Sequence, residues 1–306
     1  MSNPVIRGIH HITLCASGAQ EDVDFLSQVL GLRLIKQTVL FDGRYAHYHL
    51  YYANANAEIG SVLTTFPYRR IPGRPGTGQI SATAYTVPKG SLPFWTDHLT
   101  RHNVDHGGIQ ERFFVDALGF RKTGTDGAYH RFEVGSGGAA KTLVLYHEPD
   151  RPAGSWGFGA GTGHHLALDV GTDDALAAQK NLYEELGYTD CSEIKDRNYF
   201  HSIYVRSPGG ILTECAASVP EGFGKDEPID QLGMELLLPP WFEDRRAEIV
   251  AMLEPITVPE ANRPAGASTA RSARPLQAAE AAVGAGGVAP SRRTTAEFIG
   301  GDVPSN

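Results

Sequence analysis

The feature that most constrains the fold of this chain is a histidine doublet that opens two similar stretches of sequence. One stretch begins "HHITLCA" at His10 and the other begins "HHLALDV" at His164. An amphipathic segment ending in Leu-Gly follows each doublet, and after it come "YHLYYA" and "GSVLTTF" in the first stretch and "YFHSIYV" and "GGILTECA" in the second. Self-similarity of this kind indicates repeated units, and the hydrophobic periods predict a βαβββ module in each. Gly31 and Gly187 are placed to end the two helices.

Alternation along a strand separates the two histidines of each doublet, because successive side chains point to opposite faces. The leading histidines, His10 and His164, share their faces with Ile and Leu side chains and are therefore predicted to lie on the helix-packing side. His11 and His165 fall on the smaller and more polar face. Since the two modules repeat, a pseudo-twofold axis would bring equivalent strands together. We therefore predict that His11 and His165 face one common site.

A third polar residue in this pattern is Glu214, which stands in the otherwise apolar stretch "GGILTECA". A buried carboxylate is costly unless it is paired or bound to a metal. Two imidazoles and one carboxylate are the ligand set of non-haem iron oxygenases, which keep open positions for substrate and O2. The repeat aligns Thr65 with Glu214, and threonine is a poor ligand for such a metal. The pattern therefore predicts three protein ligands and a vacant fourth position.

The same motifs carry a resemblance to a known superfamily. From about Ile9 to Glu254 the chain resembles the vicinal-oxygen-chelate superfamily and, within it, the hydroquinone ring-cleaving dioxygenases, which include the chlorohydroquinone 1,2-dioxygenases. The similarity runs through "HHITLCA", "YHLYYA", "VLTTFP", "VPKGSL", "HEPDR", "RNYFHSIYVRSPGG" and "ECAAS". It implies an α+β fold of tandem βαβββ modules paired to form a metal-binding cup. It places the iron ligands on His11, His165 and Glu214, which are the residues that alternation selects.

The resemblance also implies an activity and the residues that assist it. The expected enzyme is an Fe(II)-dependent dioxygenase of aromatic hydrocarbon catabolism. It would insert both atoms of O2 into a hydroquinone-type ring, chlorinated or not, or a related phenolic ring. Tyr204 would donate a hydrogen bond or a proton during the reaction, and Arg197 would stabilise developing negative charge. The resemblance further implies supporting roles for Thr13, His10 and His164, although for His10 and His164 it disagrees with the alternation argument.

The domain organisation follows from where the modules fall. Members of the family have four modules, whereas this chain is short by about one in the middle, where "ISATAYTVPKGSLPFWTDHLTRHNV" predicts a strand and a helix over residues 80–104. We expect two middle modules to be merged or truncated, so that the supporting half could be rearranged or completed by a second subunit in a homo-oligomer. The predicted segments are a first module over 8–67, a merged middle over 78–150, a last module over 163–217, an extension with a short helix over 218–258, and a disordered tail over 259–306.

Composition excludes several other classes of protein. The formal net charge of -8 argues against binding to nucleic acid, which depends on Lys and Arg. No apolar run is long enough for a membrane span, and the first residues lack the pattern of a signal peptide, so we expect a cytoplasmic protein. Cys15, Cys191 and Cys215 have no disulfide or zinc spacing. The expected partners are a small aromatic substrate and O2.

Three alternatives stay open at the level of sequence. One is another metalloenzyme of the same superfamily, either a glyoxalase-like lyase or a fosfomycin-type transferase. Thr65 counts against the lyase, which usually needs a fourth ligand, whereas the transferase shares the set of two histidines and one glutamate. The second alternative is a non-catalytic small-molecule binding protein, which would not need the three ligands. The third is a poorly active remnant left by the shortened middle.

Overall fold

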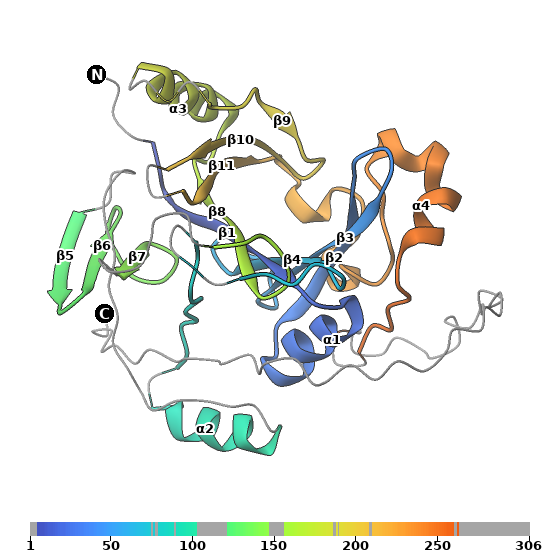
Figure 1. The fold of residues 1–306 in the computed structure, drawn as a ribbon, viewed down its shortest axis with the longest axis horizontal. Coiled ribbons are helices and arrows are strands. Elements are labelled where there is room, and N and C mark those ends of the chain that lie inside the picture. The colour runs from blue at the N-terminus through green and yellow to red at the C-terminus, as the bar shows by residue number, and fades with distance from the viewer. Residues whose placement is uncertain are drawn as a thin grey trace.

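Two four-stranded units meet edge to edge in one eight-stranded sheet (Figure 1). The structure is a computed structural model and describes residues 5–74, 76, 79–88, 90–102, 121–146, 156–185, 188, 190–207, 210–259 and 262. The strand order is β2-β3-β4-β1-β8-β11-β10-β9, and the sheet curls into a half-barrel. The strands of the first unit are β1 (Gly8–Ala16), β2 (Arg33–Phe41), β3 (Ala46–Ala53) and β4 (Val62–Pro67), and those of the second are β8 (Thr162–Asp169), β9 (Lys195–Asp196), β10 (Phe200–Arg206) and β11 (Leu212–Ser218).

The two units are related by a pseudo-twofold axis. β1 and β8 run antiparallel in the centre of the sheet, and Ile12 pairs with Leu166, its counterpart in the repeat. Each opening strand also pairs in parallel with the last strand of its own unit, β1 with β4 and β8 with β11. The predicted α+β fold of paired βαβββ modules is therefore confirmed. The units are not identical, because β2 has nine residues and β9 only two.

Each of the two central strands carries a β-bulge. Along β1 the pairing register passes directly from Ile9 to His11, so His10 is the extra residue. Along β8 the register skips His164 in the same way. A bulge interrupts strict alternation and re-aims the side chain at that point. The two leading histidines are thus the residues to which the alternation argument does not apply.

A helical segment follows the opening strand in each of the two units. In the first unit, α1 (Ala19–Val23) continues as a π-helical turn over Asp24–Val29 and stops before Gly31, whose φ of 72° is the left-handed value expected at a helix end. In the second unit, α3 (Asp173–Glu185) buries Leu176, Leu182 and Tyr183. Gly187 lies outside the described residues.

The middle region forms a separate, smaller sheet. It contains α2 (Leu92–Arg101) and three antiparallel strands, β5 (Arg121–Asp126), β6 (Tyr129–Glu133) and β7 (Thr142–Tyr146). Phe132 and Val134 pack into the core of the last unit, beside Leu168 and Val170. The predicted helix is confirmed, but the predicted strand at the start of this region is wrong. Residues 79–88 belong to neither sheet. In the other two units the opening strand pairs with the last strand of its own unit. Within the described residues β7, the last strand of the middle region, pairs only with β6.

The C-terminal extension packs against the first unit. Its short helix forms as predicted, with a 3-10 segment over Pro240–Arg245 that leads into α4 (Arg246–Met252). Ile256 and Val258 pack beside the core of the first unit, and the Asn262 amide donates a hydrogen bond to the Leu34 carbonyl. The ordered chain therefore extends past the predicted start of the tail at Pro259, and the rest of that tail lies outside the described residues.

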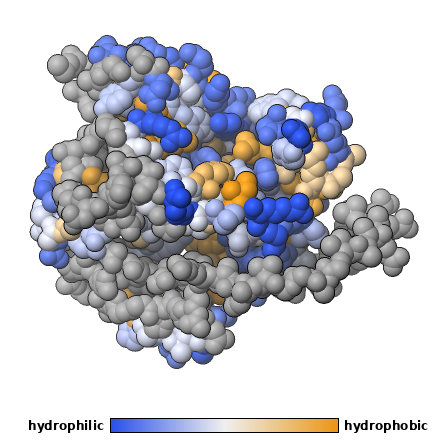
Figure 2. Space-filling view, in the orientation of Figure 1, coloured by the Kyte–Doolittle hydropathy of each residue, from blue (hydrophilic) through white to orange (hydrophobic). Residues whose placement is uncertain are grey.

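Apolar residues are also present on the surface of the molecule. On the face shown in Figure 2, hydrophobic residues gather near the centre and hydrophilic residues surround them.

Cys15 and Cys215 are buried and Cys191 is partly buried, and all three are free, as their spacing predicts. Within the described ranges, none of the helices combines the length and the apolar character that a membrane crossing requires.

Candidate metal centre

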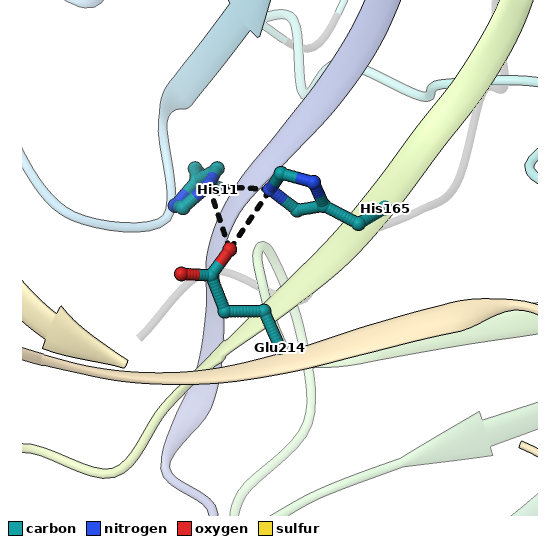
Figure 3. Close-up of side chains that lie close together, drawn as sticks. All are labelled: His11, His165 and Glu214. Atoms are coloured by element: carbon teal, nitrogen blue, oxygen red, sulfur yellow. Dashed lines mark hydrogen bonds and ion pairs between the residues drawn. The ribbon is translucent and has the colours of Figure 1, made fainter. Parts of the chain in front are cut away.

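Three side chains from three central strands converge at the middle of the sheet. His11 comes from β1, His165 from β8 and Glu214 from β11 (Figure 3). The two Nε2 atoms lie 3.0 Å apart, and Glu214 Oε2 lies 2.9 Å from His165 Nε2 and 3.5 Å from His11 Nε2. All three residues are buried, and together they form a group that could hold a metal ion. The structure thus brings together the three residues that the sequence singles out as ligands.

The chemistry of these three atoms fits a divalent cation. Glu214 Oε2 is completely buried and faces the Nε2 atoms of the two histidines. Burial lowers the pKa of His11 well below its ordinary value, so its imidazole is neutral and has a free lone pair. Metal–ligand distances of about 2.1 Å at right angles would place neighbouring donor atoms about 3 Å apart. The observed separations match such an arrangement, in which one side of the ion stays open.

Electrostatics keeps Glu214 ionised. Burial alone would raise the pKa of this carboxyl group. The electrostatic interaction with His165, the hydrogen bond between His165 and Glu214, and the electrostatic interaction with His11 together outweigh that effect. The Tyr204 hydroxyl adds to the stabilisation by donating a hydrogen bond to Glu214 Oε1 over 2.8 Å. The pKa of Glu214 therefore lies well below its usual value, and the group is a carboxylate at neutral pH.

The leading histidines contact the ligand histidines directly. The Nδ1 atoms of His10 and His11 are 2.9 Å apart, and those of His164 and His165 are 2.7 Å apart. Burial lowers the pKa of His10 to about 4 and that of His164 to about 3, so both rings are neutral. A ligand histidine that is protonated on Nδ1 can then donate to its neighbour and present Nε2 to a metal. Alternation placed His10 and His164 on the helix side, and this prediction is wrong because both stand at bulges.

The remaining residues implied by the resemblance also lie at the site. The Arg197 Nε atom donates a hydrogen bond to the Tyr204 hydroxyl over 3.2 Å, and the guanidinium lies 5.2 Å from the centre of the Tyr204 ring. Thr13 Oγ1 lies 2.8 Å from His165 Nε2. Burial raises the pKa of Tyr204, and the charge of Glu214 raises it further, so the phenol stays protonated. The Tyr204 hydroxyl and the Arg197 cation therefore lie beside the carboxylate, and the Thr13 hydroxyl lies beside His165.

The repeat position opposite Glu214 is Thr64, not Thr65. Glu214 pairs with Ala167 across β11 and β8, and in the first unit Thr64 holds the matching place beside Thr13. Aligning the "LT" of the two last strands shifted the comparison by one residue. Because one step along a strand reverses the face, Thr65 points away from the site. It lies close enough to Asp22 to lower the pKa of that carboxyl group by hydrogen bonding.

Sequence reasoning missed two residues of the site, His49 and Tyr51. His49 Nε2 lies 3.0 Å from Thr64 Oγ1, and His49 Nδ1 lies 3.0 Å from the Tyr51 hydroxyl. Tyr51 pairs with Thr64 as Tyr204 pairs with Glu214, so the two tyrosines are counterparts in the pseudo-twofold. The signal was present in the alignment of "YHLYYA" with the later strand "FHSIYVR", read in the register of the sheet.

Comparison with known proteins places this chain in a family. No family model matches the chain. The chain is 36% identical over 316 residues to chlorohydroquinone/hydroquinone 1,2-dioxygenase of Sphingobium indicum, a match that covers 83% of this chain and 98% of that relative. The chain belongs to the hydroquinone ring-cleaving dioxygenases.

Other members of this dioxygenase family support the same assignment. MhqO of Bacillus subtilis, named as a ring-cleaving dioxygenase, is 34% identical and matches 83% of this chain and 97% of its own length. A solved Bacillus subtilis structure described as a dioxygenase superposes with a TM-score of 0.75 at 31% identity, over 83% of this chain and 99% of that one. The likeness therefore extends over nearly the whole length of each relative and includes the vicinal-oxygen-chelate fold.

Proposed function

We propose that this dioxygenase-family member is an Fe(II)-dependent enzyme that cleaves a hydroquinone-type ring and inserts both atoms of O2. The observation that carries the proposal is the open triad of His11, His165 and Glu214, with the non-ligating Thr64 at the repeat position opposite Glu214. Two imidazoles and one carboxylate that leave adjacent positions free are typical of non-haem iron oxygenases. The hydroquinone dioxygenase from Sphingobium indicum supports the choice of substrate class.

The three ligands supply what such a metal requires. His11, His165 and Glu214 would hold Fe(II), which would supply electron transfer between an aromatic ring and O2. Glu214 contributes the only negative charge among the three ligands. The Nδ1 contacts of His10 and His164 fix the orientation of His11 and His165. These contacts are consistent with a role for the two leading histidines in orienting the ligands.

Tyr204 and Arg197 are placed to assist charge changes in the substrate. The Tyr204 hydroxyl bridges Glu214 Oε1 and Arg197 Nε, so its position is fixed on two sides. By turning its one O–H from Glu214, the hydroxyl could donate a hydrogen bond or a proton to a reacting oxygen. The Arg197 guanidinium offers a positive charge to oxygen atoms that become negative during ring opening. Both side chains are partly exposed beside the fully buried Glu214, on the side that a small aromatic substrate would approach.

The comparisons favour this activity over the alternatives. A glyoxalase-like lyase or a fosfomycin-type transferase would use the same fold, but the relatives that align over their full length are named as ring-cleaving dioxygenases. A non-catalytic binding protein would have no need of three buried ligand residues. The partners of the reaction are then a small aromatic substrate and O2.

The test combines metal analysis with O2 uptake. Protein reconstituted without air should retain about one Fe(II) per chain, consume O2 when hydroquinone is added, and yield a ring-opened product by mass spectrometry. His11→Ala should lose both iron and O2 uptake. His201→Ala is the matched control, because His201 lies on β10 and contacts Asp173 outside the site. Full activity in His11→Ala protein, or iron uptake without any ring-opened product from hydroquinone or catechol, would contradict the proposal.

A further inference from the structure

A line of hydrogen-bonded side chains leads away from the triad through the first unit. Thr13 Oγ1 lies 2.7 Å from Thr64 Oγ1, which lies 3.0 Å from His49 Nε2. On the other side of the same imidazole, His49 Nδ1 lies 3.0 Å from the Tyr51 hydroxyl. Thr13 and Thr64 are fully buried, whereas His49 is partly exposed. The line therefore connects the buried metal centre to a group that solvent can reach.

Thr13 links this line to the metal centre. Its Oγ1 lies 2.8 Å from His165 Nε2, the atom that faces Glu214. A nitrogen lone pair that binds a metal cannot also accept a hydrogen bond from Thr13. With His165 engaged as a ligand, the Thr13 hydroxyl is free to accept from a group beside the triad and to donate to Thr64. Thr64 can in turn donate to His49 Nε2. Each hydrogen bond of the line is then donated in the direction that leads from the metal centre to His49.

His49 has the properties of a proton acceptor that does not retain its proton. Burial, the largest cause, lowers its pKa well below the ordinary value; the positive charge of Arg197 lowers it further, whereas Glu214 raises it. The ring is held by stacking on Phe66 at 4.3 Å between ring centres. A neutral imidazole can accept on Nε2 while its Nδ1–H donates to the Tyr51 oxygen. An imidazolium formed there would soon release its proton.

The counterpart of this line in the last unit has a different composition. There Glu214 occupies the place of Thr64, and Tyr204 donates to it directly without an intervening histidine. Ser202 occupies the place of His49. One half of the pseudo-twofold therefore supplies a ligand charge, and the other supplies a route of neutral hydroxyl and imidazole groups.

We propose that Thr64 and His49 act through Thr13 as a relay that removes the proton of a phenolic substrate as it binds the metal centre. This inference rests on the proposed function. The phenol gives its proton to Thr13 Oγ1, the Thr13 proton passes to Thr64 Oγ1, and the Thr64 proton passes to His49 Nε2. The products are a phenolate and an imidazolium, with no change in electron count. His49, which is partly exposed, then releases a proton to solvent. Thr64 and His49 are positioning residues, because only Thr13 would contact the substrate.

The test follows the appearance of the phenolate directly. Fe(II)-loaded protein is mixed without air with nitrohydroquinone, and the rise of the phenolate absorbance is recorded by stopped flow. Thr64→Val and His49→Gln should bind the same amount of iron as the parent protein but form phenolate about a hundredfold more slowly. Added imidazole should restore the rate in His49→Gln, which a purely structural role would not predict. Thr64→Ser keeps the hydroxyl and should behave like the parent.

Thr65→Val provides the matched control, because Thr65 is the next residue on the same strand, is equally buried and faces away from the site. It should form phenolate at the parent rate. If Thr64→Val does not fold, His49→Gln with imidazole rescue decides the question alone. Parent rates in His49→Gln or in folded Thr64→Val would overturn the relay and leave the proposed function standing. Failure of the parent protein to bind any phenol would overturn both. Phenolate formation that is not followed by O2 uptake would overturn the proposed function alone.

Discussion

Glu214 and Thr64 occupy equivalent places in the two halves of the sheet. Glu214 lies opposite Tyr204 on β10, and Thr64 lies opposite Tyr51 on β3. Both are buried, and both point toward the histidine pair on the central strands. The carboxylate and the hydroxyl therefore approach the same centre from opposite sides.

Thr64→Glu should convert the open centre into one with four protein ligands. The new carboxylate would reach the metal from the side opposite Glu214, so we expect metal affinity to stay the same or rise about tenfold and O2 uptake per bound iron to fall at least tenfold. Thr65→Glu is the control. Its carboxylate would face Asp22 on the other side of the strand, so it should cost stability and leave turnover per bound iron unchanged. Normal turnover in iron-loaded Thr64→Glu would show that the two units do not pair at the metal as described.

His164→Leu should weaken metal binding while the three ligands stay intact. The substitution removes the Nδ1 contact that orients His165, and the loss of such a partner typically costs 10- to 100-fold in metal affinity. Competition with a chelator of known affinity gives the dissociation constant. His201→Leu, on β10 of the last unit with its ring against Asp173 outside the centre, should retain the affinity of the parent. An unchanged dissociation constant in His164→Leu would show that the contact does not orient the ligand.

Asp22→Asn should stabilise the protein at high pH and have little effect at low pH. Burial raises the pKa of Asp22 to about 7, above its ordinary value of 3.8, although hydrogen bonds from Thr65 and Tyr52 oppose the shift. The folded state therefore binds more protons than the unfolded state between these two values, and stability falls as the pH rises through that window. Because Asp22 is partly exposed, we expect a gain on the order of 1 kcal/mol at pH 8 relative to pH 5. Urea unfolding at the two pH values measures it, and an equal effect at both would contradict the assignment.

The middle sheet should exchange its amide hydrogens faster than the central strands. Nearly every residue of β5 is exposed, and β7 leaves one edge unpaired within the described fold while exposing Leu145 and Tyr146. Local opening there costs little because few apolar contacts are lost. In dilute monomer we expect exchange in β5 and β7 at least a hundredfold faster than in β1 and β8. Protection that rises with protein concentration would indicate a second subunit over the free edge, whereas uniformly slow exchange in the monomer would refute the prediction.

Truncation should separate the ordered extension from the predicted tail. A chain that ends after Asn262 keeps its hydrogen bond to Leu34 and should unfold at the same urea concentration as the full chain. A chain that ends after Glu254 loses the packing of Ile256 and Val258 against the first unit and should be about 1–3 kcal/mol less stable. If the chain that ends after Asn262 did not fold, the tail would have a structural role.

Alternation predicted the candidate ligands because the pairing is regular from His11 and from His165 onward and along β11 at Glu214. It misplaced His10 and His164 because each is the extra residue of a bulge, and a bulge leaves no mark in a hydrophobic pattern. The resemblance to a known family placed these two correctly beside the candidate ligands, because it matches individual residue positions and does not depend on the alternation of side chains along a strand.

Pairing register explains the other differences. The letters "LT" occur in both last strands, and matching them aligned Glu214 with Thr65, one residue from its true counterpart. A single step is enough to exchange the two faces of a strand. His49 and Tyr51 were missed for a related reason, because their place beside the centre depends on the pairing of β3 with β4. The missing strand at residues 79–88 shows the same limit, since a strand needs a neighbour as well as a favourable sequence.

The pseudo-twofold has a consequence for charge balance. Two neutral imidazoles and one carboxylate leave a divalent ion with one positive charge that no protein group among the three ligands neutralises. The surroundings are buried, so an uncompensated charge there is costly. Because the Arg197 guanidinium also lies beside the centre, an anionic ligand would reduce that cost, whereas a neutral ligand would leave it in place. By holding a hydroxyl where its counterpart holds a carboxylate, Thr64 would leave part of the charge of a bound cation for an anionic ligand to balance.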